Sequence, residues 1–200
     1  MTETKLAEET SAANKVKRSL DILQSGNAGT IEYSARIMGI VDSLRKFTRL
    51  DAGSRQKVDL HEEIDSALYL LKHDLGDRIT VDRQHGDIPH VTCSASDLNQ
   101  VFMHLLRNAV AAIDGSGAIK VRSRADAGKV QIDVGDSGVG MSAEQVQRAF
   151  DPTFTRSGTR ARVGLGLFTS YGIVKQHDGE ISIESRLGEG TTVTVTLPVV

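Results

Sequence analysis

The sequence has 200 residues, of which 39% are hydrophobic and 25% charged, and a formal net charge of −2 at pH 7. This composition is that of an ordinary globular protein, and the near-zero charge excludes a general attraction to nucleic acid or to an anionic membrane. Because no apolar run reaches the length of a membrane span and no signal-peptide pattern opens the chain, we predict a soluble cytoplasmic protein.

The sequence of residues 1–52 predicts a helical hairpin. They contain no proline, and apolar residues recur at helical spacing on both sides of a turn at Ser25–Thr30. Their apolar surface is larger than two helices can hide from water, so we expect a homodimer through residues 1–52, built as a four-helix bundle. Packing of the hairpin against the downstream part of the chain is the alternative. The two stripes consist of Leu6, Ala13, Val16, Leu20 and Leu23, and of Tyr33, Ile37, Ile40, Leu44 and Phe47.

Strand and helix patterns mix beyond a linker at residues 51–55. The expected strands are Val58–Leu60, Ile79–Asp82, Val91–Cys93, Ile119–Ser123, Val130–Val134, Ile181–Glu184 and Thr192–Leu197, with a hairpin turn near Gly128. The expected helices are 61–74, Ala95 or Ser96 to about Ile113, 142–149 and 165–177. This order predicts an α+β fold over residues 56–200, a two-layer α/β sandwich with helices on one face of a mixed sheet. Cys93, the only cysteine, lies in an apolar run and is expected in the core of a protein from a reducing compartment.

Three features carry chemistry. Asn108 lies in the middle of a predicted helix, and its amide carbonyl is a hard oxygen of the kind that Mg²⁺ prefers. The segment Asp136-Ser-Gly-Val-Gly140 follows a strand, where a carboxylate can accept a hydrogen bond from an adenine amino group and glycines let the backbone approach a flat ring. The segment Gly164-Leu-Gly-Leu167 opens a helix, whose free N–H groups suit phosphate oxygens. Each feature alone has an ordinary explanation, as a satisfied helix asparagine, a turn and a loop, so the prediction depends on their combination.

The combination resembles the ATP-binding domain of histidine kinases, a branch of the superfamily that includes gyrase, the heat-shock chaperone ATPases and the mismatch-repair ATPases. Four motifs carry the resemblance, followed by a last strand that is also similar. Leu98–Ala109 resembles the N box and Asp136–Gly140 the first glycine box. Phe150–Thr155 resembles the F box, Gly164–Leu167 the second glycine box, and Gly188–Pro198 the last strand.

The resemblance implies a Bergerat-type ATP fold with ATP and Mg²⁺ as cofactors. It implies that Asn108 ligates the metal, that Asp136 reads the adenine amino group, and that Gly138 and Gly140 shape the adenine pocket. Residues from about 150 to 163 form the lid, which carries Arg156, Arg160 and Arg162. The implied ATP-binding residues are Asn108, Asp136, Gly138, Gly140, Thr155, Gly164, Leu165, Gly166, Leu167 and Thr191.

Three positions depart from the family pattern. Arg162 replaces the first glycine of the second glycine box, Thr153 stands where an aromatic is common, and His104 stands where the N box usually has Asn. We expect these departures to tune affinity and lid order without abolishing binding. The gyrase and chaperone enzymes place a Glu at the position of His104 to activate water, so fast hydrolysis of that type is not expected here. His104 and Asn108 are the candidate catalytic residues. His104 could act as a base, and the alternative is a histidine that only packs in its helix.

The phosphate acceptor of a histidine kinase is absent from the expected place, because residues 1–60 contain no histidine. The register of Val16–Leu23 against the family places the acceptor position at Ala7, followed by Glu8. His61 is followed by two glutamates but falls in the first helix of the ATP domain, so we discount it. The remaining candidates, His73, His85, His90 and His177, lie among polar residues and are predicted to be surface residues.

Three explanations remain open for this absence: replacement of the acceptor by Ala7, an acceptor outside this chain, or a different use of the ATP domain. The first interpretation of the function is a dimeric core of a two-component histidine kinase, which binds ATP-Mg²⁺ and takes part in phosphoryl transfer to a histidine and on to the receiver domain of a response regulator, without nucleic acid. The second is a non-catalytic ATP-sensing scaffold that docks a partner through its hairpin. An ATPase motor or clamp is the third.

Overall fold

The computed structural model describes residues 54–151 and 165–199. The predicted hairpin at 1–52, the candidate acceptor Ala7 and most of the predicted lid lie outside these residues. The described part contains a five-stranded mixed sheet in the order β2-β4-β5-β7-β6, in which only β2 and β4 run parallel. The strands are β2 (Ile79–His85), β4 (Gly117–Asp126), β5 (Lys129–Asp136), β6 (Glu180–Arg186) and β7 (Gly190–Pro198).

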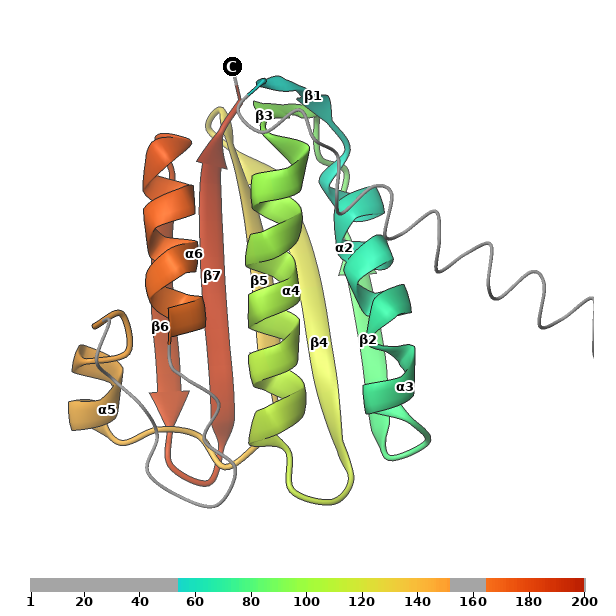
Figure 1. Cartoon of the computed structure of the whole chain (residues 1–200), viewed down its shortest axis with the longest axis vertical. Helices are drawn as coiled ribbons and strands as arrows, with labels where there is room; N and C mark the ends of the chain where they lie inside the picture. Colours follow the sequence, from blue (N-terminus) through green and yellow to red (C-terminus); the bar gives the residue numbers. More distant parts are fainter. Residues whose placement is uncertain (1–53, 152–164, 200) are drawn as a thin grey trace, which may run out of the picture. The chain divides into compact units, whose positions relative to one another are not determined.

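Three helices lie over one face of this sheet, which confirms the two-layer prediction (Figure 1). They are α2 (Leu60–Leu70), α4 (Ala95–Ala112) and α6 (Leu165–Gln176), and the shorter helices are α3 (Lys72–Leu75) and α5 (Ala143–Gln147). None of the helices in the described ranges is long and apolar enough to cross a membrane.

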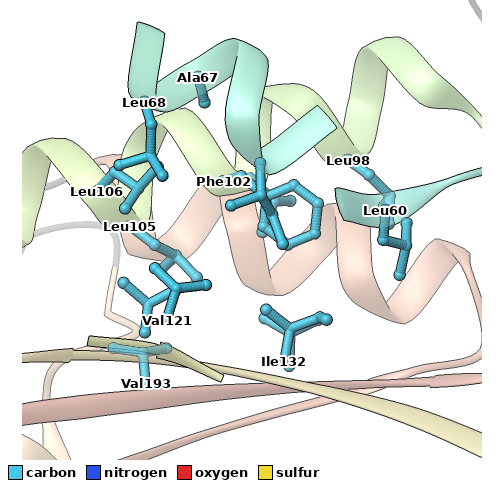
Figure 2. Close-up of a cluster of buried hydrophobic side chains, with 14 of the residues drawn as sticks. Leu60, Ala67, Leu68, Leu98, Phe102, Leu105, Leu106, Val121, Ile132 and Val193 are labelled. Carbon is cyan, nitrogen blue, oxygen red and sulfur yellow. The ribbon is translucent and has the colours of Figure 1, made fainter. Parts of the chain in front are cut away.

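The core lies between α2, α4 and the sheet. Helix α4 begins at Ala95 because the Ser94 hydroxyl caps it, accepting a hydrogen bond from the Asp97 N–H at 3.4 Å. Its apolar stripe includes Leu98, Phe102 and Leu105, which Figure 2 shows gathered with side chains of α2 over strand residues Val121, Ile132 and Val193. Phe102 is fully buried, so truncation to Ala should cost about 3–5 kcal/mol of stability.

Two predicted element boundaries were wrong around Asp59. The first strand is β1 (Gln56–Val58), which pairs antiparallel with β3 (Val91–Cys93), and Leu60 already belongs to α2. Asp59 separates them, because its Oδ1 accepts a hydrogen bond from the His61 N–H at 2.9 Å and thereby caps α2. The helix predicted at 61–74 is also divided, since Leu71 ends α2 before α3 begins.

The prediction that His177 lies at the surface was wrong, because its side chain is only 6% exposed. Its Nδ1 lies 2.8 Å from the Ile173 carbonyl, and its Nε2 accepts from the Ser94 N–H at 3.0 Å. A carbonyl only accepts and an N–H only donates, so the proton must be on Nδ1. The imidazole therefore joins the end of α6 to the first turn of α4. The other three predicted surface histidines, His73, His85 and His90, are exposed.

Cys93 lies in the core, as predicted, with no exposed surface. Burial raises the pKa of its thiol to about 12, and the carboxylates of Glu63 and Asp97 add to this effect. A thiol with such a pKa is a small apolar side chain at neutral pH and not a nucleophile.

Candidate functional site

The helix-covered face of the sheet changes from apolar to polar at one end of three neighbouring strands. Alternate residues of a strand share a face, so Asp136 continues the row of the buried Val134 on β5. In the same way Thr191 continues the row of Val193 on β7, and Ser185 that of Ile183 on β6. Thr191 is the register partner of both Asp136 and Ser185. Three polar side chains, one from each strand, therefore lie side by side at one end of the strands, which is the lower end in Figure 1. We call this end of the strands the sheet edge.

Ser185 is the centre of a hydrogen-bond network at this edge. Its Oγ accepts from the Met141 N–H at 2.8 Å and donates to the Gly190 carbonyl at 2.9 Å. The third neighbour is the Oγ1 of Thr191, at 2.8 Å. The network therefore ties the loop after β5 to the hairpin between β6 and β7.

The Asp136 carboxylate organises the loop that follows it. Its Oδ1 accepts a hydrogen bond from the Gly138 N–H at 2.8 Å. An ionised carboxylate has about four lone-pair sites on its two oxygens and only accepts hydrogen bonds. The side chain is half-buried, so this group presents acceptor oxygens at the edge of the sheet.

The glycines at this edge are required by the fold itself. A Cβ at Gly138 would overlap the Ala112 carbonyl, and a Cβ at Gly140, where φ is +63°, would overlap the Arg186 carbonyl. The Val139 N–H donates to that Ala112 carbonyl at 3.0 Å, and the Val139 carbonyl accepts from the Gly188 N–H at 2.8 Å. The glycines thus let the loop pack against α4 and against the β6–β7 hairpin, a demand that exists without any ligand.

One face of α4 joins this loop to the start of α6. His104, Asn108 and Ala112 are spaced four residues apart and therefore share a face of the helix. The Ala112 end contacts the loop of Gly138, and the His104 ring packs against Gly166, where an added Cβ would lie 3.5 Å from its Cγ. Asn108 lies between these two contacts, and its side chain is exposed.

His104 is half-buried at the contact with α6, and its Nδ1 is fully buried without a hydrogen-bond partner in the described residues. Burial lowers the pKa of this imidazole, and the positive charge of Arg107 lowers it further. A hydrogen bond to the Gly166 backbone acts in the opposite direction. A lowered pKa means that the ring is neutral at pH 7.

The described residues hold no group of three or more His, Cys, Asp or Glu side chains that could bind a metal ion. A magnesium ion at this edge would therefore depend on the exposed Asn108 oxygen together with ligands from a phosphate and water. This donor set fits Mg²⁺, which commonly keeps several waters and binds with substrate phosphates.

The structure brings together most of the site residues predicted in its described part. Asp136, Gly138, Gly140 and Thr191 lie at one end of the sheet, Asn108 shares a face of α4 with His104, and Gly166 contacts His104 from the first turn of α6, where Leu167 follows it. Thr155, Gly164 and the lid arginines lie outside the described residues, as does the side chain of Leu165.

Sequence reasoning missed Ser185 and Gly190. Gly190 has a φ of +97°, and a Cβ there would overlap the Asp136 carbonyl, so it holds β7 against the start of the loop. Ser185 had a detectable signal, because it breaks the apolar alternation of Ile181 and Ile183 on the buried face. The buried amide of α4 was also missed: it is Asn99, whose Nδ2 donates to the Glu63 Oε2 at 2.7 Å.

The sequence of residues 93–200 matches the family described as histidine kinase-, DNA gyrase B- and HSP90-like ATPases. The sensor histidine kinase ZraS of Escherichia coli K12 is 35% identical over 167 residues, which cover 82% of this chain and 35% of that protein. Sporulation kinase E of Bacillus subtilis is 41% identical over 115 residues, which cover 56% of this chain and 15% of that protein. The chain thus spans about a third or less of the length of these two relatives.

Solved structures agree with this match. The catalytic domain of the histidine kinase ThkA is 26% identical with a TM-score of 0.65, and the similarity covers 72% of this chain and 97% of that chain. The mycobacterial sensor histidine kinase MprB is 25% identical with a TM-score of 0.64 and the same coverage. With more than half of its sequence matched and this fold, the chain belongs to the family of histidine kinase-, DNA gyrase B- and HSP90-like ATPases and carries the ATPase domain of a two-component sensor histidine kinase.

Proposed function

We propose that this chain binds ATP-Mg²⁺ at the edge formed by α4, β5, β7 and α6, as the dimeric kinase core of a two-component signalling system. The observation that carries the proposal is the alignment of Asp136 and Thr191 beside the face of α4 that presents Asn108. Base recognition, metal binding and phosphate binding each have a group of suitable chemistry at this one edge.

Adenine recognition is assigned to Asp136. One carboxylate oxygen accepts from the Gly138 N–H, which holds the side chain in place. An ionised carboxylate can accept more than one hydrogen bond, so Asp136 can also accept from the exocyclic amino group of adenine, and a hydrogen bond to a charged acceptor contributes about 1.5–3 kcal/mol. Thr191 stands opposite Asp136 and supplies a second polar group next to the same position.

Phosphate and metal binding are assigned to Asn108 and the first turn of α6. Asn108 offers its carbonyl oxygen to Mg²⁺, which when bound would neutralise phosphate charge. Gly166 lies in the first turn of α6, where backbone N–H groups have no partner within the helix. The neutral ring of His104 packs against Gly166, so we assign it a role in positioning that turn.

The similarity to ZraS supports a kinase-like role for the first 52 residues. The aligned region covers 82% of this chain. Residues 56–200 make up a smaller share of the chain, so the aligned region extends into the predicted hairpin. We propose that this hairpin dimerises and docks the receiver domain of a response regulator. Cytoplasmic localisation is part of the same proposal.

Phosphoryl transfer from this site would break the bond between the γ-phosphorus and the bridging oxygen of ATP, with ADP leaving. The bond that forms joins phosphorus to an imidazole nitrogen, which must be unprotonated to attack. Residues 1–60 hold no histidine, and the proposed family position of the acceptor is Ala7. The phosphoryl group would therefore go to a histidine outside residues 1–60, on a partner or on residues outside this chain, or the chain would bind ATP without transfer.

The direct test is transfer of label from γ-labelled ATP, measured for the wild-type chain, Ala7→His and Ala7→Gln. We expect acid-labile, base-stable phosphohistidine only in Ala7→His, because glutamine has no comparable nucleophile. If Ala7→His binds ATP and forms no phosphohistidine, the assignment of Ala7 or the role of the hairpin is wrong.

The absence of histidine from residues 1–60 also favours a second candidate, a non-catalytic ATP-sensing scaffold. ATP binding without transfer to any regulator or partner histidine would support it. Sustained hydrolysis would support an ATPase motor or clamp instead, which the lack of a carboxylate at position 104 disfavours.

A further inference from the structure

We propose that Ser185 orients the hydroxyl of Thr191 as a hydrogen-bond acceptor and thereby sets the preference of the site for a 6-amino purine over a 6-oxo purine. Ser185 is not itself assigned to the nucleotide, so its role is that of a positioning residue. This inference rests on the proposed nucleotide site and assigns a determinant of its base specificity.

The argument begins with the single proton of the Ser185 hydroxyl. Three polar atoms lie within 2.9 Å of its Oγ, namely the Met141 nitrogen, the Gly190 oxygen and the Thr191 Oγ1. The Met141 N–H can only donate, so it uses one lone pair of Ser185. The Gly190 carbonyl can only accept, so the Ser185 proton points to it.

The orientation of Thr191 follows from these two bonds. The Ser185 proton and one lone pair are then in use, and one lone pair remains. The contact between the two hydroxyls therefore requires Thr191 to donate to Ser185. Thr191 then has no proton for another partner, and its Oγ1 can only accept further hydrogen bonds. Asp136, its register partner on β5, also only accepts when ionised.

Two acceptors side by side select the base by the chemistry of its 6-position. The amino group of adenine carries two N–H donors and satisfies such a pair, either directly or through a water. The 6-oxo group of hypoxanthine or guanine is itself an acceptor, so an acceptor that faces the 6-position has no partner there, and the only donor nearby is the N1–H of these bases. An unpaired acceptor is costly where water is excluded. If Ser185 were absent, the Thr191 hydroxyl could rotate and donate to a 6-oxo group.

The experiment compares ATP with inosine triphosphate, which differs in its base only by the 6-oxo group and the N1 proton that accompanies it. Binding of each nucleotide with Mg²⁺ is measured by calorimetry for the full 200-residue chain and for Ser185→Ala, Ser185→Thr, Thr191→Val and the double variant Ser185→Ala/Thr191→Val. Ser182→Ala is the matched control, because Ser182 is an exposed serine of the same strand.

We expect the wild-type chain to prefer ATP at least tenfold, and Ser185→Ala to lower this ratio about fivefold, the effect of one neutral hydrogen bond. Thr191→Val should lower the ratio similarly, and the double variant should lower it no further than either single variant. Ser185→Thr and Ser182→Ala should keep the wild-type ratio, because the first retains the hydroxyl and the second lies away from the network.

The outcomes separate this inference from the proposed function. If Ser185→Ala weakens both nucleotides equally and leaves the ratio unchanged, Ser185 only supports the loop and the inference is overturned. A wild-type chain that binds both nucleotides equally also overturns it, while ATP binding itself stands. If the wild-type chain binds neither nucleotide, the proposed function fails first.

Discussion

Gly140 and Arg186 lie so close that a Cβ on the glycine would overlap the arginine carbonyl oxygen. The backbone of Gly140 also has a φ of +63°, in the left-handed region. We therefore predict that Gly140→Ala destabilises the domain by more than about 2 kcal/mol, from backbone strain and from the displaced hairpin. Chemical denaturation measures this, with Gly128→Ala as the comparison: Gly128 also has a positive φ, but its Cβ would meet nothing. Equal losses in the two variants would mean that the overlap contributes nothing.

Gly166 should behave differently from Gly140. An added Cβ would make only ordinary contacts with the His104 ring, at 3.5 Å or more, so Gly166→Ala should change the free energy of unfolding by less than about 1 kcal/mol. If phosphates approach the first turn of α6, the same methyl group should weaken ATP binding about tenfold or more. Denaturation and calorimetry on one variant separate the two effects. Unchanged ATP affinity would remove Gly166 from the phosphate site.

Acidification should destabilise the domain through His61 and His104. Burial lowers the pKa of both imidazoles from the ordinary value of 6.5, and the neighbouring His85 lowers that of His61 further. When the pH falls through 6.5, the unfolded chain therefore binds protons that the folded chain does not, and this part of the stability is lost. Stability from these groups is present above pH 6.5 and decreases below it.

Urea unfolding at pH 7.5 and pH 5.5 measures this effect. The decrease in the free energy of unfolding should be smaller in His61→Gln and in His104→Gln than in the wild-type chain, while His73→Gln serves as an exposed control. The prediction is contradicted if His61→Gln and His104→Gln lose as much stability on acidification as the wild-type chain does.

Cys93 should not react with thiol reagents in the folded state. Its side chain is fully buried and burial raises its pKa to about 12, so almost no thiolate exists at pH 8. An aromatic disulfide reagent should modify one thiol per chain in urea and almost none in buffer, since the sequence has a single cysteine. Rapid labelling of the native protein would show that β3 opens readily.

Much of the fold was predictable because the apolar patterns are regular. The helix predicted from Ala95 or Ser96 to about Ile113 is α4, and the alternation on both sides of Gly128 predicted the β4–β5 hairpin. The short segment Val58–Leu60 was ambiguous, because three residues cannot distinguish a strand from a capped helix start. Asp59 decided the outcome through its hydrogen bond to the His61 N–H.

The residues that sequence reasoning misplaced or missed are held by contacts distant in sequence. His177 has polar neighbours in the chain, yet it is buried because Ser94, 83 positions away, donates to its ring. The role of Ser185 follows from its hydrogen bonds to Met141 and Thr191, which belong to two other segments of the chain. The motif residues Asp136 and Asn108 could be proposed from sequence because their pattern is local, whereas the residues that support the loop after Asp136 are set by tertiary structure.

The most direct test of the central claim is calorimetric titration of the full chain and of Asp136→Asn with ATP-Mg²⁺, with the exposed Asp74→Asn as control. In Asp136→Asn the amide oxygen must still accept from the Gly138 N–H, which turns the amide NH₂ toward the adenine amino group, donor against donor. We predict clear binding by the wild-type chain and by Asp74→Asn, and at least tenfold weaker binding by Asp136→Asn. No binding by the wild-type chain, or equal binding by Asp136→Asn, would contradict the assignment of this edge as the ATP site.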